Sequence, residues 1–490
     1  MNQTADGETK DLATVLPPRY RWLKRLASAF AGLLVFLFVV RLWWGWEAHR
    51  RLQAEIDRIV ARGEPIYPED FDPPEETPDD QNAALAFIKA AQQMNTTAKQ
   101  DEIISGSVDL WEITPEQWKL ISDFETNNRA SLELIRQARL KTTVDWGIRF
   151  RSPAFQAFTA ILPNLSRQRQ LCRVLCAVAM ANHYTGDDAV AMETLRDVLF
   201  LAEALDQIPS TVSWLTSEAT VAMAVKRLEF CTPDLIVDCP GGANRSLIDA
   251  VMANLLDEEA PRRALLTAMY AERMYQVDTV RLLVGGDLGP SALAWVGAVG
   301  PASAWERAVQ FPVTPLYEVD AALMIQDMDQ IIQACGLPSW PEAYEILGPL
   351  DKKWEKLLMG SGQFRRPMSR FLFSTQSRVA LIHFRYLAKR RMAAIALAIR
   401  LYEIHHGRRP AALAVLVPEY LDEVPRDPMD PDGATFRYLP EAEIPVLYSI
   451  GENGIDDGGL WWDEKRGNYD RHNRLDIVFL LDGVLPDPPP

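Results

Sequence analysis

The chain has 490 residues, of which 48% are apolar and 24% charged, and it carries a formal net charge of −16 at pH 7. This length and composition are typical of a globular protein with room for two or three domains. The excess of acidic residues, with no basic stripe to offset it, argues against a nucleic-acid partner.

The first element in chain order is an apolar helix at residues 24–46. Residues 26–40 carry no charge, and the run LWWGW extends the apolar stretch to residue 46. About twenty apolar residues in a helix cross the roughly 30 Å hydrocarbon core of a bilayer. Arg41 interrupts the run near one end, where a long side chain can reach the headgroups. The three tryptophans that follow are typical of an interfacial aromatic belt.

The orientation of this segment is predicted from the chain on either side of it. Basic residues flank both ends of the segment in nearly equal number, so the excess of Lys and Arg that marks the cytoplasmic side does not decide the orientation. We predict an inside N-terminus, because the tail of residues 1–23 is basic close to the membrane and the acidic bulk of the chain follows the segment. A cleaved signal peptide is the poorer alternative, since the basic region is long and no small-x-small cleavage site follows.

Residues 47–81 join this segment to the rest of the chain. A charged amphipathic helix is expected up to Gly63, and the stretch EPIYPEDFDPPEETPDDQN that follows is dense in Pro, Asp and Glu. Proline stiffens a linker and like charges extend it. We therefore interpret the stretch as a spacer that holds the bulk of the protein away from the membrane.

Residues 82–376 show apolar residues at helical spacing in nearly every segment, which predicts a mainly α-helical domain. Thr114–Gln117 forms a capping box, with Pro115 at the first helical position, for a helix that continues to Leu140. Two helices around the Gly-Asp turn at 185–188 predict an αα-hairpin that is similar to a tetratricopeptide repeat. Because no 34-residue period recurs, the expected architecture is an irregular αα-hairpin array. Further helices are predicted at 211–230, 245–257, 261–283, 316–335, 341–359 and 378–406.

Five cysteines and one segment that lacks charge over much of its length complete this region. None of the five cysteines stands in a CxxC pattern, so haem attachment and thioredoxin chemistry are not expected. Cys231 and Cys239 flank a turn, where either free thiols or a disulfide would fit. Residues 286–305 contain four glycines and two prolines, which favours a buried or partner-covered loop over a second membrane span. Trp295 and Trp305 in this segment are the candidate anchors for a protein partner.

The C-terminal region carries the most specific pattern of the chain. Residues 396–430 read ALAIRLYEIHHGRRPAALAVLVPEYLDEVPRDPMD, and IPVLYSIGENGIDDGG and LDI follow. We predict a short helix at Leu413–Leu421 that ends at the Val424–Pro428 corner, and strand-like runs at 435–439, 446–450 and 475–480. In order and spacing this resembles the C-terminal domain of the major pseudopilins of bacterial type II secretion. The resemblance implies a long helix and a small antiparallel sheet at 377–484, before a short disordered tail at 485–490. It also implies a bacterial inner-membrane protein whose residues 47–490 lie outside the cytoplasm, in the periplasm.

The resemblance further implies a calcium loop. Asn453 takes the place of the first loop Asp of the family, and Asp476 that of the Asp in the closing "DI". Together with Asp456 and Asp457 they form the candidate calcium site, because calcium prefers oxygens from carboxylates, amides and backbone carbonyls. The chain departs from the family at Asn453, which is neutral, and in a longer interval before Asp476. A solvated acidic turn is the alternative.

The sequence also departs from pseudopilins in lacking a prepilin-peptidase site before its membrane helix, so we expect a retained N-terminus and no role as a pilus subunit. No GxSxG, Walker A, GxGxxG or HExxH motif is present. We therefore predict a non-enzymatic, membrane-anchored scaffold that binds an extracytoplasmic protein, linked to secretion or envelope assembly. The alternative is an extracytoplasmic hydrolase with its site in the helical domain.

Overall fold

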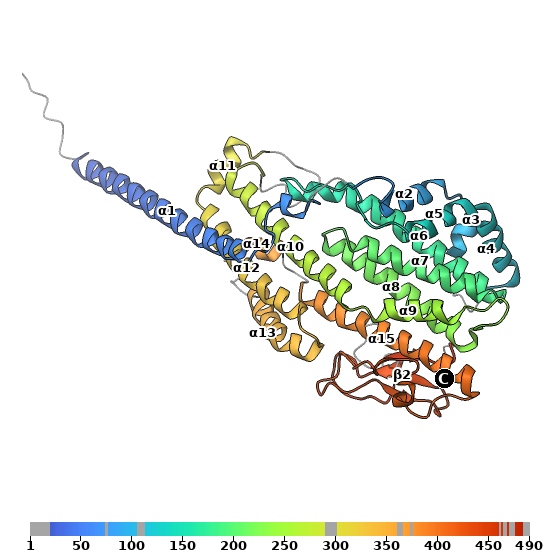
Figure 1. Ribbon diagram of the computed structural model, residues 1–490. Helices are drawn as coiled ribbons and strands as arrows, with labels where there is room; N and C mark the ends of the chain where they lie inside the picture. The colour runs from blue at the N-terminus through green and yellow to red at the C-terminus, as the bar shows by residue number, and fades with distance from the viewer. Residues whose placement is uncertain are drawn as a thin grey trace, which may run out of the picture.

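The computed structural model describes residues 20–73, 77–104, 113–289, 301–359, 366–372, 376–459, 462–463, 468–469 and 476–483. Within these residues the fold is mainly helical, with few strands and one long apolar helix at the N-terminal end. Figure 1 shows an elongated body of packed helices, from one end of which helix α1 projects. The mainly α class predicted from the sequence is confirmed.

Helix α1 runs without a break from Arg21 to Ala61 and has two parts. Its first part is exposed, and an 18-residue window there has a mean hydropathy of 2.2 with none of it buried. The helix is therefore long and apolar enough to cross a membrane. From Ala48 onward one face is buried, through Leu52, Ile56 and Ile59. Residues three and four apart share a helix face, so this stripe packs into the body while the opposite face stays in solvent.

The helices of the body follow each other closely along the chain, and most pack against a neighbour in sequence. Their bounds are α2 Ala83–Gln93, α3 Ala98–Ile104, α4 Pro115–Asn127, α5 Arg129–Ala138, α6 Phe158–Tyr184, α7 Asp188–Leu205, α8 Thr211–Cys231, α9 Arg245–Leu256, α10 Glu259–Gly285, α11 Ala304–Gln310, α12 Thr314–Cys335, α13 Trp340–Met359, α14 Pro367–Leu372 and α15 Gln376–His406.

The helix predicted from Thr114 to Leu140 is divided into α4 and α5 at Asn128. The capping box at its start is present, with Thr114 and Gln117 bonded reciprocally. The Asn128 carboxamide, however, donates to the carbonyls of Phe124 and Asn95 at 2.9 and 3.0 Å and accepts the Asn95 amide at 2.8 Å. Such side-chain bonds compete with the helical ladder. The division thus ties α4 to the chain after α2.

Helices α6 and α7 form the predicted αα-hairpin. Gly186 takes a φ of +80° in the connecting turn, a conformation that glycine adopts without strain. The Asp187 carboxylate then accepts the Val190 amide and caps α7. The likeness of this hairpin to a tetratricopeptide repeat stays a prediction. All five cysteines are free thiols, with Cys231 buried and Cys239 exposed, so the disulfide alternative does not apply here.

The described part of the acidic segment after α1 differs from the projecting spacer that the sequence predicted. Ile66 and Pro68 are buried, and a short 3₁₀ turn at Pro68–Phe71 packs on α10. Arg273 of α10, which is fully buried, contacts the Glu64 carboxylate at 2.8 Å. A buried guanidinium is costly without partners, so this contact holds the segment against the body.

Helix α15 lies at the centre of the C-terminal half. It contacts α8, α9, α12 and α13 as well as strands β2 and β5. Strands β1 (Arg437–Leu439), β2 (Val446–Ser449) and β5 (Ile477–Leu480) form an antiparallel sheet in the order β1-β2-β5, with Leu447 opposite both Tyr438 and Phe479. These strands overlap the three strand ranges predicted from the sequence. A separate pair is formed by β3 (Trp462–Asp463) and β4 (Asn468–Tyr469).

The helix predicted at Leu413–Leu421 is reduced to a 3₁₀ turn at Leu413–Leu416. Val417 is extended, with φ −95° and ψ 136°. Pro418 accounts for this, because a residue before proline is disfavoured in the helical region.

Candidate functional site

The antiparallel pairing of β2 and β5 creates the acidic loop. Ser449 at the end of β2 is opposite Ile477 at the start of β5. Asp476 directly precedes β5, so it lies beside the loop of residues 450–459 that follows β2. The structure therefore brings Asp476 to Asn453, Asp456 and Asp457, although 19 or more residues separate it from each of them in the chain.

Asp476 is the buried member of this group, with an exposed fraction of 4%. Its carboxylate accepts the backbone amides of Gly459 at 2.7 Å and of Asp457 at 3.4 Å. Burial raises the pKa of Asp476 to about 6, and the nearby carboxylates of Asp457 and Asp456 act in the same direction. The charge on this carboxylate is thus incompletely compensated by the two amides.

The other three residues lie nearer the surface and bond locally. Asp456 accepts the Tyr448 hydroxyl and the Gly458 amide, both at 3.0 Å, and an Arg437 nitrogen lies 3.4 Å from it. The Asn453 amide group donates to Asp457 at 2.9 Å. Asn453 and Asp456 are exposed and Asp457 is half-buried.

These contacts bear on the predicted calcium site without deciding it. Among the described residues, no three His, Cys, Asp or Glu side chains are grouped so that they could hold a metal ion. Asp456 is engaged with Arg437, which competes with a cation. Most of the chain between Gly459 and Asp476 lies outside the described residues. The calcium site stays a prediction.

Asp427 is a residue of this region that sequence reasoning assigned only to a corner. It is 2% exposed, and its carboxylate accepts the Ser449 hydroxyl at 2.7 Å and the Ile450 amide at 3.0 Å. It also accepts the Met429 amide at 2.9 Å. Burial raises the pKa of Asp427. Asp427 therefore fixes the start of the acidic loop, and its place in the proline-rich PRDPMDP run was the available signal.

Two tryptophans, Trp295 and Trp305, are the predicted anchors for a protein partner. Trp295 lies outside the described residues. Trp305 lies on α11 and is 77% exposed. Exposed apolar residues accompany it at Val309, Phe311 and Val313.

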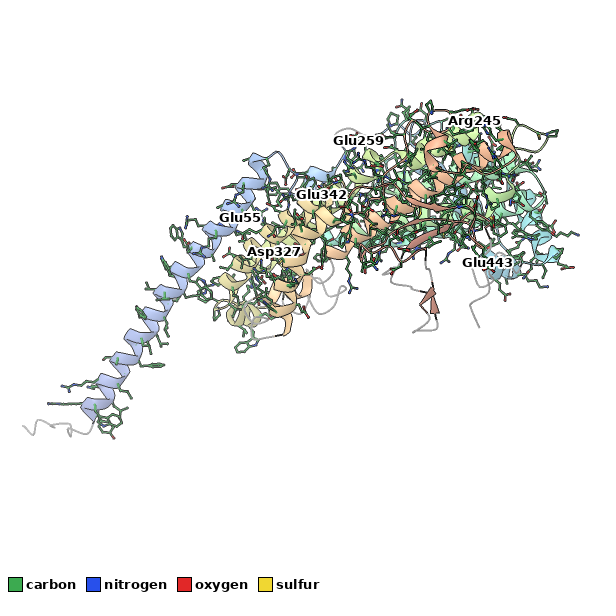
Figure 2. The ribbon with its side chains drawn as sticks, turned by 90° about the horizontal axis from the view of Figure 1, so that it is seen from below. Glu55, Arg245, Glu259, Asp327, Glu342 and Glu443 are labelled. Atoms are coloured by element: carbon green, nitrogen blue, oxygen red, sulfur yellow. The ribbon has the colours of Figure 1, made fainter. Side chains whose placement is uncertain are left out.

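A cleft of about 830 Å³ separates α9 and the start of α10 from residues 418–426. Its lining is rich in charge, and Figure 2 labels Arg245 and Glu259 on its walls. Several of these charges are paired, as Arg245 with Asp249 at 2.7 Å and Arg391 with Glu258 at 2.5 Å. The cleft was not predicted, because it arises where two parts distant in sequence meet.

Sequence reasoning also missed a pair of carboxyl groups inside the helical body. Glu218 of α8 is 4% exposed, and burial raises its pKa to about 7. Burial also raises the pKa of Asp206, at the end of α7, and the Glu218 carboxylate raises it further. Arg390 of α15 lowers both pKa values through its charge. Raised carboxyl pKa values occur at catalytic sites as well as in structural networks, and neither carboxyl lines the cleft described above.

Comparison of the chain with known protein families, with curated proteins and with solved structures found no match in any of the three.

Proposed function

We propose that the protein is a membrane-anchored scaffold that holds its body outside the cytoplasm of a bacterium and binds another extracytoplasmic protein there. The observation that carries the proposal is the continuity of α1. Its exposed apolar part passes directly into a part whose face is buried from Ala48 onward. A single helix thus serves as both anchor and structural element of the body.

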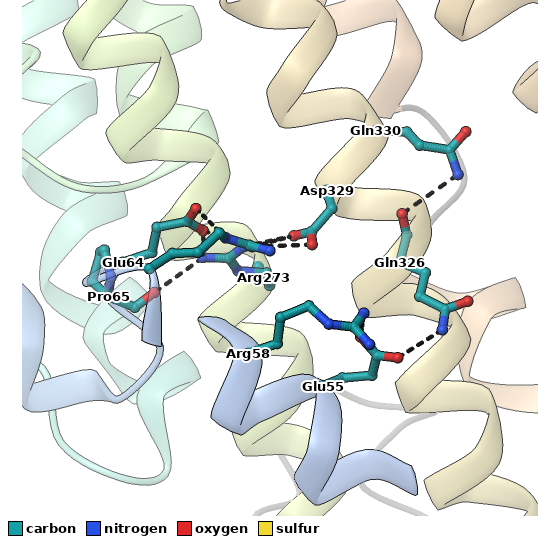
Figure 3. A network of polar contacts seen from close by, with 9 residues as sticks. Glu55, Arg58, Glu64, Pro65, Arg273, Gln326, Asp329 and Gln330 are labelled. Atoms are coloured by element: carbon teal, nitrogen blue, oxygen red, sulfur yellow. Dashed lines mark hydrogen bonds and ion pairs between the residues drawn. The ribbon is translucent and has the colours of Figure 1, made fainter. Parts of the chain in front are cut away.

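Side-chain contacts between α1 and α12 support a rigid connection between the body and the anchoring helix. His49 bonds Glu318 at 2.9 Å, Glu55 bonds Gln326 at 2.8 Å, and Arg62 reaches Asp329 at 3.0 Å. Residue numbers rise together in both helices, so α1 and α12 run parallel. Figure 3 shows Glu55, Asp329 and Arg273 joining α1, α12 and α10. These contacts fix the body relative to the second part of α1.

The C-terminal region supports the proposed location and role. Its resemblance to the pseudopilin domain, an assembly module of a secretion system, favours an extracytoplasmic position and a protein partner. The acidic loop beside Asp476 is proposed as the calcium site of that module, where calcium from the periplasm would bind. The charged cleft between α9 and residues 418–426 offers a concave surface where the helical body meets the C-terminal region.

Topology reporters test the proposal. A reporter active only outside the cytoplasm, fused after Pro490, is expected to work, whereas a cytoplasm-only reporter at the same place is expected to be silent. The opposite result would overturn the predicted orientation and, with it, the argument for calcium binding.

Crosslinking in native membranes, followed by identification of the bound proteins, tests the role as a scaffold. Recovery of envelope or secretion proteins is expected.

One observation favours a second candidate function, an extracytoplasmic hydrolase. The buried carboxyl groups of Asp206 and Glu218 have raised pKa values, as general acids do. The purified protein would be assayed on peptide, ester and glycan substrates beside its Glu218→Gln variant. Turnover lost in the variant, while thermal stability is retained, would favour the hydrolase over the scaffold.

A further inference from the structure

Helix α11 and the turn after it form a surface of exposed apolar side chains, which we call the α11 patch. Its members are Trp305, Val309, Phe311 and Val313, with exposed fractions of 77, 56, 43 and 39%. Soluble faces rarely leave such a contiguous apolar group bare. The patch therefore calls for an occupant.

The contacts of Phe311 place the patch beside the exposed part of α1. The Phe311 ring stacks on Phe38 with centroids 6.2 Å apart, and the Arg41 guanidinium lies 4.4 Å above the same ring. Arg41 also donates to the Phe311 carbonyl at 2.6 Å. Just beyond, a Cβ at Gly45 would lie 3.8 Å from Pro315 at the start of α12. In Figure 1, α11 lies at the end of the body from which α1 projects.

The position of these contacts along α1 indicates what covers the α11 patch. Phe38 belongs to the uncharged run of residues 26–40. It lies nine residues before Glu47, which is about 14 Å of helix at 1.5 Å per residue. If α1 crosses a membrane, a side chain packed on Phe38 is level with lipid rather than with bulk water. The contact to the Phe311 carbonyl also gives Arg41 a partner at that depth, where an unpaired charge is costly.

We propose that the α11 patch inserts into the leaflet of the bilayer on the side where the body lies, and gives the protein a second membrane contact beside α1. This inference rests on the proposed anchoring role of α1. It assigns Trp305 to lipid rather than to a protein partner, because the patch is continuous with the lipid-facing surface of α1. Tryptophan and short amphipathic helices are well suited to the membrane–water interface.

Lipid-borne quenching tests the inference in the full-length protein. Cys239, the exposed cysteine, is replaced by serine, and the four buried cysteines are kept. Single cysteines are then introduced by Val309→Cys or Val313→Cys and labelled with an environment-sensitive fluorophore in phosphatidylcholine nanodiscs. Phe36→Cys on the exposed part of α1 is the reference. Leu140→Cys, 82% exposed just after α5, is the control, because Figure 1 shows α5 away from the end of the body from which α1 projects.

The labels at positions 309 and 313 are expected to lose emission in doxyl-lipid nanodiscs as the label at 36 does, while the label at 140 does not. Quenching at 36 without quenching at 309 and 313 would overturn the patch but leave the anchor. Absence of quenching at 36 would overturn the anchor and the inference with it. Labels at 309 and 313 that are shielded from aqueous iodide, yet insensitive to doxyl lipid, would show a protein surface over the patch and overturn the lipid assignment.

Discussion

Glu218 illustrates how burial couples a single carboxyl group to stability. Its pKa is raised from 4.5 to about 7 by desolvation, against the opposing charge of Arg390. Between these two values the folded protein keeps a proton that the unfolded chain releases. Protonation thus stabilises the folded state at low pH, and this contribution is lost as the pH rises toward 7.

We predict that Glu218→Gln flattens the pH dependence of stability between pH 4.5 and 7, the window set by the raised pKa of Glu218. Glutamine has no proton to release in the unfolded chain, so the variant is expected to exceed the parent by on the order of 3 kcal/mol near the top of this window. Denaturant unfolding at several pH values measures the effect. Glu345→Gln, at an exposed position on α13, is the control and should leave the profile unchanged. Parallel profiles for the parent and Glu218→Gln would contradict the prediction.

Asp476 is the residue on which the calcium prediction depends. Saturating calcium at millimolar concentration over a micromolar site should stabilise the full-length protein by about 4 kcal/mol, by ligand linkage. Asp476→Ala should abolish this increment. It should also cost about 1–3 kcal/mol without calcium, because the amides of Gly459 and Asp457 lose their acceptor.

The measurement is the thermal midpoint with calcium and with chelator. Glu443→Ala removes an exposed carboxylate from the same C-terminal region, in the turn before β2, and should keep the full calcium response. A parent midpoint that calcium does not move would leave the acidic turn as the correct interpretation of residues 450–459.

At the scale of elements, the second part of α1 belongs to the body. Ile56 is 1% exposed and lies in the main core, whereas Val60 of the same helix is 50% exposed. We predict that Ile56→Ala destabilises the body by about 2–4 kcal/mol through the lost contacts and the cavity left behind. Val60→Ala should change stability by no more than about 0.5 kcal/mol. Urea unfolding of the detergent-solubilised protein measures both, and equal effects would show that α1 is only a tether.

At the scale of the whole molecule, α15 joins the helical array to the small sheet. Residues on several sides of it, including Phe384, Met392 and Leu397, are buried in the main core. The boundary at 376/377 that sequence reasoning placed between two domains thus falls at the start of a helix shared by both.

We predict that residues 377–490 expressed alone do not form a stable domain, because α15 would expose the face that α8, α9, α12 and α13 cover. Exposed apolar helix faces of this kind promote aggregation. The full-length protein is expected to lose its helical and sheet signals in one transition. A soluble 377–490 fragment with dispersed amide resonances would show instead that the C-terminal region folds independently.

Much of the secondary structure was predictable because its signals are local. The uncharged run in α1, the capping box at Thr114 and the turn at Gly186 depend on residues within a few positions of each other. The same holds for the three strands of the sheet, which overlap their predicted ranges. In the candidate site, the glycine-rich acidic turn was visible in the sequence. The hydrogen bonds by which Asp427 supports this turn were not visible, because Asp427 and its partner Ser449 are 22 residues apart in the chain.

The sequence by itself determined the mainly helical class, the apolar N-terminal helix and the position of the acidic turn, because helix period, chain length and turn chemistry are properties of short segments. Only the tertiary structure decided that the acidic segment after α1 folds onto α10 and that Asp206 and Glu218 share one interior. It also decided that Phe311 packs on Phe38, 273 residues away in the chain. Such contacts form between segments distant in sequence, where burial and charge pairing outweigh the local preference of either segment alone.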